Sequence, residues 1–248
     1  MSAWTAIESV SPGLALPWLK ALPRWLIIFA TLAAPAIASA HGIAGKDAAF
    51  VAATSGPEIL AFMYHGAKHM VTGYDHLLFI TGVIFFLYRL KDVALYVTMF
   101  SLGHSITLLY GVLSNVHVNS YLVDAVIGLS VVYKAFENLD GFKTVFGVQP
   151  NPRVAVLGFG LVHGFGLATK LQDLHLKPPG LLANLVAFNA GVEIGQLIAL
   201  SGILVIIIWW RSNPGFARQA IIANTMVLAA GMLLIAYQLA GYFTQARA

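Results

Sequence analysis

The side chains of this sequence that could do chemistry are a few histidines and carboxylates set among apolar residues. Neutral imidazole with carboxylate suits borderline divalent ions such as nickel, cobalt, zinc or iron, with copper not excluded, whereas magnesium and calcium prefer all-oxygen sites. The chain has no cysteine, so thiolate ligands and disulfides are ruled out. The residue types therefore predict a site for a divalent transition metal ion. Its candidate ligands are, in chain order, His65, His69, Asp75, His76, His104, His163 and Glu193.

The composition indicates where such a site would lie. Of 248 residues, 59% are hydrophobic and 10% are charged, with a mean hydropathy of +0.81; a soluble domain carries about a quarter charged residues. We therefore expect an all-α, polytopic membrane helix bundle in contact with the lipid bilayer. Its 14 Lys and Arg are scattered singly, which is typical of helix-end anchors and disfavours nucleic-acid binding. Dinucleotide-binding and P-loop motifs are absent, which argues against an ATP-driven pump.

The first 40 residues are typical of a secretory signal peptide. Lys20 and Arg24 precede the apolar run 25–40, which ends in the small-residue triplet Ala-Ser-Ala, as cleavable signals do. Cleavage would place His41 at the mature amino terminus on the exported side. A free amine beside an imidazole can chelate a metal ion, although an accidental histidine at a cleavage site is the simpler explanation. An uncleaved membrane anchor is the alternative interpretation.

Six later segments are apolar enough to cross a bilayer, which takes about 20 residues. We expect residues 41–73 to form an exported segment with a short interfacial helix over 57–72, and residues 74–243 to form the transmembrane domain. With an exported terminus, the lysines and arginines of the linkers are in slight excess on the inner side. The predicted spans are 74–90, 93–114, 120–139, 153–172, 181–210 and 217–243.

Polar groups inside the spans need an explanation, because inserting one costs about 2.5–3.5 kcal/mol. His104, His163 and Glu193 each lie about ten residues, or roughly 15 Å at the helical rise, from the outer ends of three different spans. Their common depth would let them converge in a small bundle. A lone membrane histidine more often hydrogen-bonds a neighbouring helix than binds a metal ion, but this explanation weakens for several groups at one depth.

Two carboxylates near the ends of the span 120–139 have simpler explanations. Asp124 is close enough to the interface to be a solvated helix-start residue, and Glu137 can pair with Lys134 or Lys143. We expect neither to belong to a metal site.

Glycines flank two of the histidines. His69 and His76 are two helical turns apart and would share a face if the helix continued through Gly73; if Gly73 breaks the helix, His65 and His69 form a separate pair at the entrance. The stretch GFGLVHGFGLA (158–168) has four glycines around His163. They thin the helix, so that neighbouring backbones can approach it closely.

The histidine and glycine motifs of this sequence resemble those of the HupE/UreJ family of bacterial membrane proteins. The family's H-x5-D-H signature matches His69 to His76, and the wider pattern GYDHLLF, GHSITL, LVHGFGLA and FNAGVEIGQL resembles its second branch over residues 41–243. The resemblance implies a six-span secondary permease of the bacterial inner membrane for nickel or cobalt. It also implies that His69, Asp75 and His76 lie at the entrance and His163 deeper.

The sequence departs from the family's second signature, F-H-G-x-[A/V]-H-G-x-E. Only Gly160, Val162, His163 and Gly164 of it are kept, while Phe159 replaces its first histidine and Gly166 its glutamate. We expect His104 and Glu193 to supply the lost imidazole and carboxylate from neighbouring helices. Such an exchange could keep the charge of the site and change the ion that it prefers.

Three functions fit these residues. Secondary or facilitated transport of a divalent metal ion is favoured over an enzyme. An intramembrane metalloenzyme with tightly bound metal, which would activate water or oxygen, is the second. An accessory subunit of a larger membrane complex is the third, and a homo-oligomer is left open as well.

A site of this composition predicts pH-dependent uptake. Imidazole and carboxylate ligands must be deprotonated to bind a metal ion, so the rate should fall as the pH drops through the range in which histidine titrates. Metal uptake by cells expressing the protein, compared at neutral and mildly acidic pH, measures this. An unchanged rate would contradict a histidine site.

Overall fold

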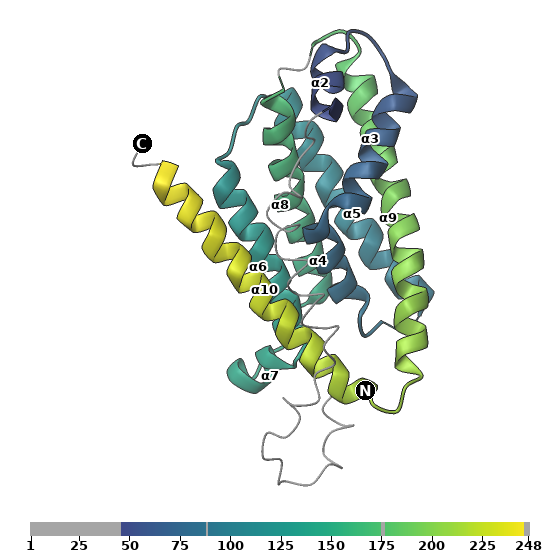
Figure 1. Ribbon diagram of the computed structural model, residues 1–248, viewed down its shortest axis with the longest axis vertical. Helices are drawn as coiled ribbons and strands as arrows, with labels where there is room; N and C mark the ends of the chain where they lie inside the picture. The colour runs from purple at the N-terminus through teal and green to yellow at the C-terminus, as the bar shows by residue number, and fades with distance from the viewer. Residues whose placement is uncertain (1–45, 88, 175–176, 246–248) are drawn as a thin grey trace.

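A computed structural model describes residues 46–87, 89–174 and 177–245, and these residues form a helical bundle with no strand among them (Figure 1). The all-α prediction is confirmed for this part of the chain. The predicted signal peptide and His41 lie outside it. The helices are α2 (Lys46–Ala53), α3 (Ile59–Thr72), α4 (Tyr74–Ile84), α5 (Leu90–Leu113), α6 (Ser120–Asn138), α7 (Gly141–Phe146), α8 (Pro152–Gln172), α9 (Leu181–Arg211) and α10 (Phe216–Gln245).

Four of the described helices are long and apolar enough to cross a membrane, namely α5, α8, α9 and α10. They correspond to four of the six predicted spans. A fifth predicted segment, 120–139, forms α6 over its whole length, but it includes charged residues. The first predicted span, 74–90, forms only the 11-residue α4, which is about 16 Å long at the helical rise. The described helices thus support a multi-pass membrane protein and leave the number of spans open.

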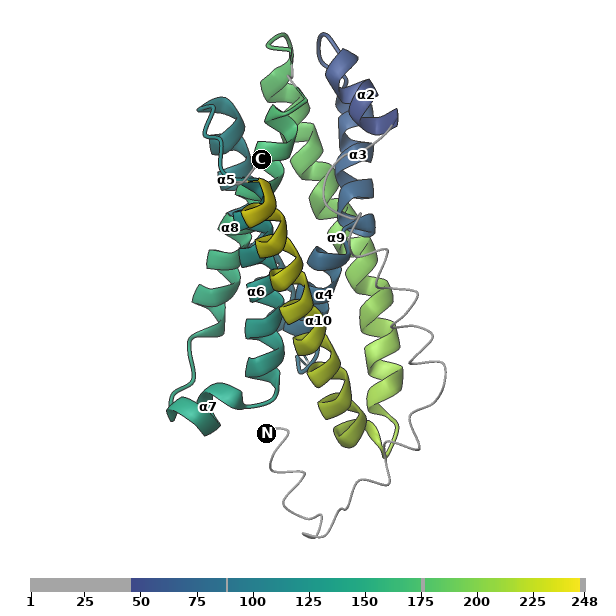
Figure 2. The same ribbon diagram turned by 60° about the vertical axis from the view of Figure 1, so that its left-hand side comes forward.

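Gly73 breaks one stretch of helix into two. It lies between α3 and α4 in an extended conformation (φ −75°, ψ 91°). Its amide donates to the carbonyl of His69 (2.8 Å) and its carbonyl accepts from the amide of Leu77 (3.0 Å), so helical hydrogen bonds continue on both sides of it. The two helices lie one after the other along the bundle (Figures 1 and 2), and their 14 and 11 residues together exceed the about 20 residues that a span requires.

The helix α3 forms where a short interfacial helix was expected, but it packs lengthwise and in parallel against the first half of α9 (Figure 2). Glycines make this possible. A Cβ atom on Gly66 would overlap the carbonyl oxygen of Phe188, and one on Gly191 would overlap that of Met63. With hydrogen in place of Cβ the two backbones touch directly, so the polar stretch HGAKH is held against a helix.

Two further helix pairs pack in the same way. In the parallel pair of α5 and α8, Gly103 faces the backbone of Leu157 and Gly160 faces that of Phe100. In the antiparallel pair of α6 and α10, Gly128 and Gly231 lie at the same contact. A Cβ on Gly231 would be 3.2 Å from the carbonyl oxygen of Gly128. Three glycine-packed pairs therefore make up most of the bundle. The α2 helix marks one end of it and α7 the other (Figure 1).

The end of α4 that lies away from Gly73 is held by Arg211, the last residue of α9. Its guanidinium donates to the carbonyls of Ile84 and Leu87 (2.9 and 2.8 Å) and also to that of Phe85. These carbonyls belong to the last turn of α4 and the residues that follow, where helical partners run out. The short helix is thus fixed at its carboxyl end by a charged cap.

Of the two predictions for the carboxylates of α6, the one for Asp124 is wrong and the one for Glu137 is confirmed. Asp124 is buried at 5% exposure, and both its oxygens lie 3.0 Å from Nζ of Lys170 on α8. Asp124 therefore forms an interhelical ion pair with Lys170 and is not a solvated helix-start residue, because a buried carboxylate needs a counter-charge. Glu137 pairs with Lys134 at 2.9 Å, which confirms one of its two predicted partners.

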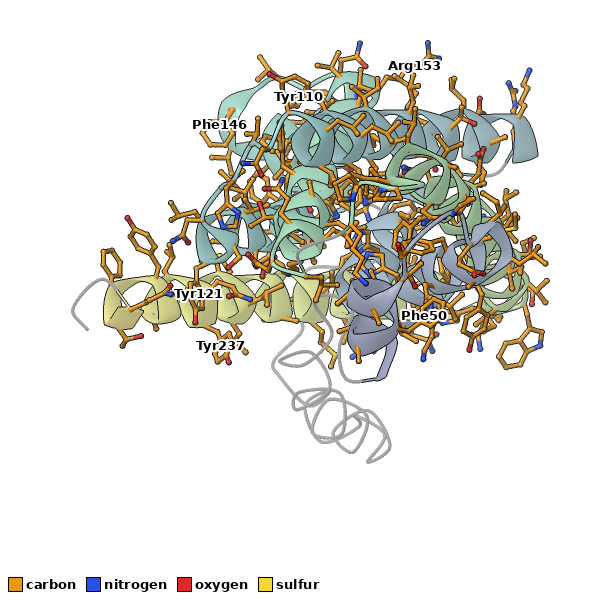
Figure 3. All side chains as sticks on the ribbon, turned by 90° about the horizontal axis from the view of Figure 1, so that it is seen from above. Phe50, Tyr110, Tyr121, Phe146, Arg153 and Tyr237 are labelled. Carbon is orange, nitrogen blue, oxygen red and sulfur yellow. The ribbon has the colours of Figure 1, made fainter. Side chains whose placement is uncertain are left out.

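Large apolar and aromatic side chains cover the outside of the bundle. Tyr110, Phe146 and Tyr237 are more than half exposed and project from its periphery when the bundle is viewed from above (Figure 3). A soluble protein rarely exposes apolar side chains on this scale. The outer surface therefore fits lipid contact.

We predict that Gly191→Ala destabilises the protein, whereas Gly202→Ala on the same helix does not. A Cβ on Gly191 would enter the backbone of α3, while nothing lies within 4 Å of one on Gly202. Overpacking of this kind costs about 1–3 kcal/mol. Thermal unfolding of the purified proteins in detergent measures the difference, and equal melting temperatures would show that α3 and α9 do not pack through this glycine.

Candidate metal centre

Three histidines from three helices meet inside the bundle. One ring nitrogen of each of His69, His76 and His104 lies within 4.8 Å of one from each of the others. The side chains are 8%, 4% and 1% exposed, respectively. We call these three residues the histidine triad. It is the group within the described residues in which three or more metal-binding side chains come this close.

The break at Gly73 explains how two members of the triad meet. His69 lies in the last turn of α3 and His76 in the first turn of α4. Their ring centroids are 5.1 Å apart, with the planes at 75°. The predicted break is present, but His69 faces His76 across it and does not belong to a separate pair with His65. His65 lies one turn nearer the α2 end, where its ring contacts Phe50 (5.2 Å).

The third member, His104, comes from the middle of α5. Its ring centroid is 5.8 Å from that of His76. The glycines of α8 bring α5 and α8 together at this level, since a Cβ on Gly164 would overlap both the carbonyl oxygen of His104 and the hydroxyl of Thr107. That hydroxyl also donates to the carbonyl of Leu161 (2.6 Å) and ties the two helices together.

His163 on α8 lies beside the triad. Its ring is 4.8 Å from that of His76 and nearly perpendicular to it, and it is 1% exposed. Its Nε2 is 3.1 Å from Oγ of Ser130 on α6. The single hydroxyl proton of Ser130 is donated to the carbonyl of Ile127 (2.6 Å), so the serine oxygen accepts from Nε2–H. A neutral His163 ring therefore carries its proton on Nε2 and its lone pair on Nδ1.

Other predicted ligands are not brought to the triad. Glu193 is exposed on α9, while the buried face of that helix at this level carries Val192 and Gln196. The carboxylate that was expected to replace the one missing at Gly166 therefore points away from the histidines. The side chain of Asp75 and the whole of His41 lie outside the part of the chain that the structure describes.

Two polar residues near the histidines were given no role from the sequence. Ser130 orients His163, and Gln196 accepts a hydrogen bond from Ser101 (2.6 Å) between α9 and α5, with both side chains buried. A serine or glutamine in an apolar helix is common as a link between helices. The roles of Ser130 and Gln196 can be recognised only from the positions of their hydrogen-bond partners on other helices.

The triad is close to the geometry of a bound ion but wider. A transition metal with bonds of about 2.0–2.1 Å to imidazole holds tetrahedral ligand atoms roughly 3.4 Å apart. The nitrogens of the triad spread up to 4.8 Å, so they would have to move together by about an ångström to close on an ion. Small rotations of the three rings would suffice.

The bundle and its buried imidazoles define a multi-pass helical membrane protein with a candidate centre for a transition metal. A family model described as HupE / UreJ protein matches residues 45–246. The chain therefore belongs to the HupE/UreJ family, which is associated in general with nickel and cobalt uptake. Searches of curated proteins and of solved structures each found no match.

We predict that Ser130→Ala weakens metal binding by about 10–100-fold, which is the usual effect of removing a group that orients a ligating imidazole. Ser201→Ala is the matched control, because its exposed hydroxyl donates to the carbonyl of Leu197 on its own helix. Titration of the purified variants with Co²⁺ measures the affinities. Equal affinities would show that Ser130 and His163 serve only helix packing.

Proposed function

We propose that the protein is a secondary permease or facilitator that carries a divalent transition metal ion, nickel or cobalt, across the bacterial inner membrane. The observation that carries this proposal is the convergence of His69, His76 and His104, from three helices, within 4.8 Å in the interior of the bundle. Membership of the HupE/UreJ family supports it.

The chemistry of the triad favours borderline ions. Three neutral imidazoles bind nickel, cobalt, zinc and copper in preference to magnesium or calcium. Because the rings are almost fully buried, an ion that binds there must leave most of its water behind. The ligands that replace this water set the selectivity.

A transporter must also release its ion. The triad is spread more widely than a closed site and is built across the break at Gly73, which is a backbone joint between two of its ligands. A small change in the angle between α3 and α4 would alter the separation of His69 and His76. A site that can open at this joint can release its ion, as a transporter must.

The ion would enter from the α2 end. His65 lies on α3 one turn before His69, on the α2 side of the triad, where it would take part in the approach of the ion. In the sequence, Asp75 directly precedes His76, and its carboxylate is included in the proposed entrance. With an exported amino terminus, this end of the bundle faces the periplasm.

We predict that His104→Gln lowers both Co²⁺ affinity and Co²⁺ uptake by more than about tenfold, since even the loss of a group that only orients a ligand costs 10–100-fold. His117→Gln is the matched control, because His117 is exposed and lies 3.7 Å from Asp173 near the α2 end of the bundle. Binding is measured by titration of the purified protein, and uptake by metal influx into proteoliposomes. Co²⁺ influx that does not differ between His104→Gln and the unchanged protein would refute the proposal.

The alternatives give different results in the same experiments. A metalloenzyme would keep a stoichiometric metal ion through a chelator wash, and its proteoliposomes would show no influx. An accessory subunit would show neither binding nor influx, and His104→Gln would alter only its stability. Elemental analysis before and after the chelator wash separates the three functions.

A further inference from the structure

A layer of phenylalanines lies directly beneath the histidines, on the side that faces the α7 end. Phe79 follows His76 by three residues on α4, which runs toward α7. Phe100 and Phe159 precede His104 and His163 by four residues on α5 and α8, which run away from α7. Each phenylalanine is therefore one helical turn, or about 4.5–6 Å, closer to the α7 end than the histidine of its own helix.

The ring of Phe79 contacts the rings of the other two phenylalanines. The ring centroid of Phe79 is 5.4 Å from that of Phe100 and 5.6 Å from that of Phe159. Phe79 and Phe100 are each 1% exposed, and Phe159 is partly buried. Three helices thus contribute one aromatic ring each to a continuous apolar contact, which we call the phenylalanine layer.

The layer is also in contact with the histidines above it. The ring of His163 is 5.1 Å from that of Phe100 and 5.6 Å from that of Phe79. Beside Phe100, the hydroxyl of Ser101 is bonded to Gln196 of α9. An ion at the histidines that moves toward the α7 end therefore meets aromatic carbon at once.

Polar groups resume beside the layer and on its α7 side. Tyr133 of α6 lies on the ring of Phe159 at 5.3 Å, and the same helix then carries the ion pair of Lys134 and Glu137 (2.9 Å). The other carboxylate oxygen of Glu137 accepts from the amide of Gln149 (3.3 Å). Histidines on one side and a carboxylate on the other are thus separated by a single apolar layer.

We propose that Phe79, Phe100 and Phe159 form a hydrophobic gate that controls release of the metal ion toward the α7 end, an inference that rests on the proposed transport function. Apolar constrictions block ions by excluding the water that must accompany them. The three phenylalanine rings offer a divalent ion no ligand in place of the imidazoles. It passes when the rings separate and water or Glu137 comes within reach.

The polarity of the layer, more than its volume, should then set the rate. Phe79→Asn puts an amide into the layer and lets water in, whereas Phe79→Leu keeps it apolar. Phe62→Asn is the matched control, because Phe62 is also buried (3% exposed) and lies on α3, outside the layer. The readouts are Co²⁺ influx into proteoliposomes with a fluorescent chelator inside, Co²⁺ affinity in detergent, and thermal unfolding to verify that each variant is folded.

We expect Phe79→Asn to raise the initial rate of influx by about tenfold, which corresponds to a barrier lowered by about 1.4 kcal/mol. Its Co²⁺ affinity should stay within about twofold of the unchanged protein, because the triad is intact. Phe79→Leu and Phe62→Asn should leave the rate near that of the unchanged protein. If Phe79→Asn does not fold, Phe159→Asn replaces it, since Phe159 is only partly buried and its substitution buries less polar surface.

The results separate failure of the gate from failure of transport. Suppose that the unchanged protein binds and passes Co²⁺. The gate is then overturned, and transport stands, if Phe79→Asn is no faster than the unchanged protein or if Phe79→Leu is as fast as Phe79→Asn. If the unchanged protein neither binds Co²⁺ nor exceeds protein-free liposomes, both proposals are overturned.

Discussion

The close approach of α8 to α5 is the contact that places His163 beside the histidine triad. Gly160 and Gly164 let the backbone of α8 lie against that of α5 at Phe100 and His104. In lipid, where hydrophobic burial gives little preference for one helix pairing over another, such direct packing decides which helices are neighbours. Imidazoles reach only a few ångströms from their helix axis, so a methyl group at Gly164 would move His163 away from the other rings. The position of His163 relative to His104 is thus set by residues that have no side chain.

A single glycine likewise accounts for the break between α3 and α4. One residue, Gly73, leaves the helical conformation, and hydrogen bonds continue on both sides of it. The far end of α4 is held by Arg211, and α3 is held against α9 by Gly66 and Gly191. The two half-helices are therefore fixed to different parts of α9, and their joint lies at the triad. Movement of α3 relative to α4 would change the distance between His69 and His76 first.

Much of this organisation could be predicted from the sequence, because apolar runs and glycine clusters are local signals. The helical class, the apolar spans of α5, α8, α9 and α10, and the thinning of α8 around His163 follow from them. The rotation of each helix does not. Depth along a span placed His104, His163 and Glu193 at one level, but depth says nothing about which way a side chain faces, and Glu193 turned out to be exposed. Likewise Asp124 was judged by its distance from the span end, whereas its burial is decided by Lys170, 46 residues away.

The break at Gly73 also has an electrostatic meaning. A helix carries roughly half a positive charge at its amino end and half a negative charge at its carboxyl end, from the aligned dipoles of its peptide groups. Because α3 ends where α4 begins, opposite poles of two helices lie within one residue of each other in the interior of the bundle. A cation is attracted on the His69 side and repelled on the His76 side. The backbone itself therefore makes a local difference in potential across the joint, between the His69 side and the His76 side.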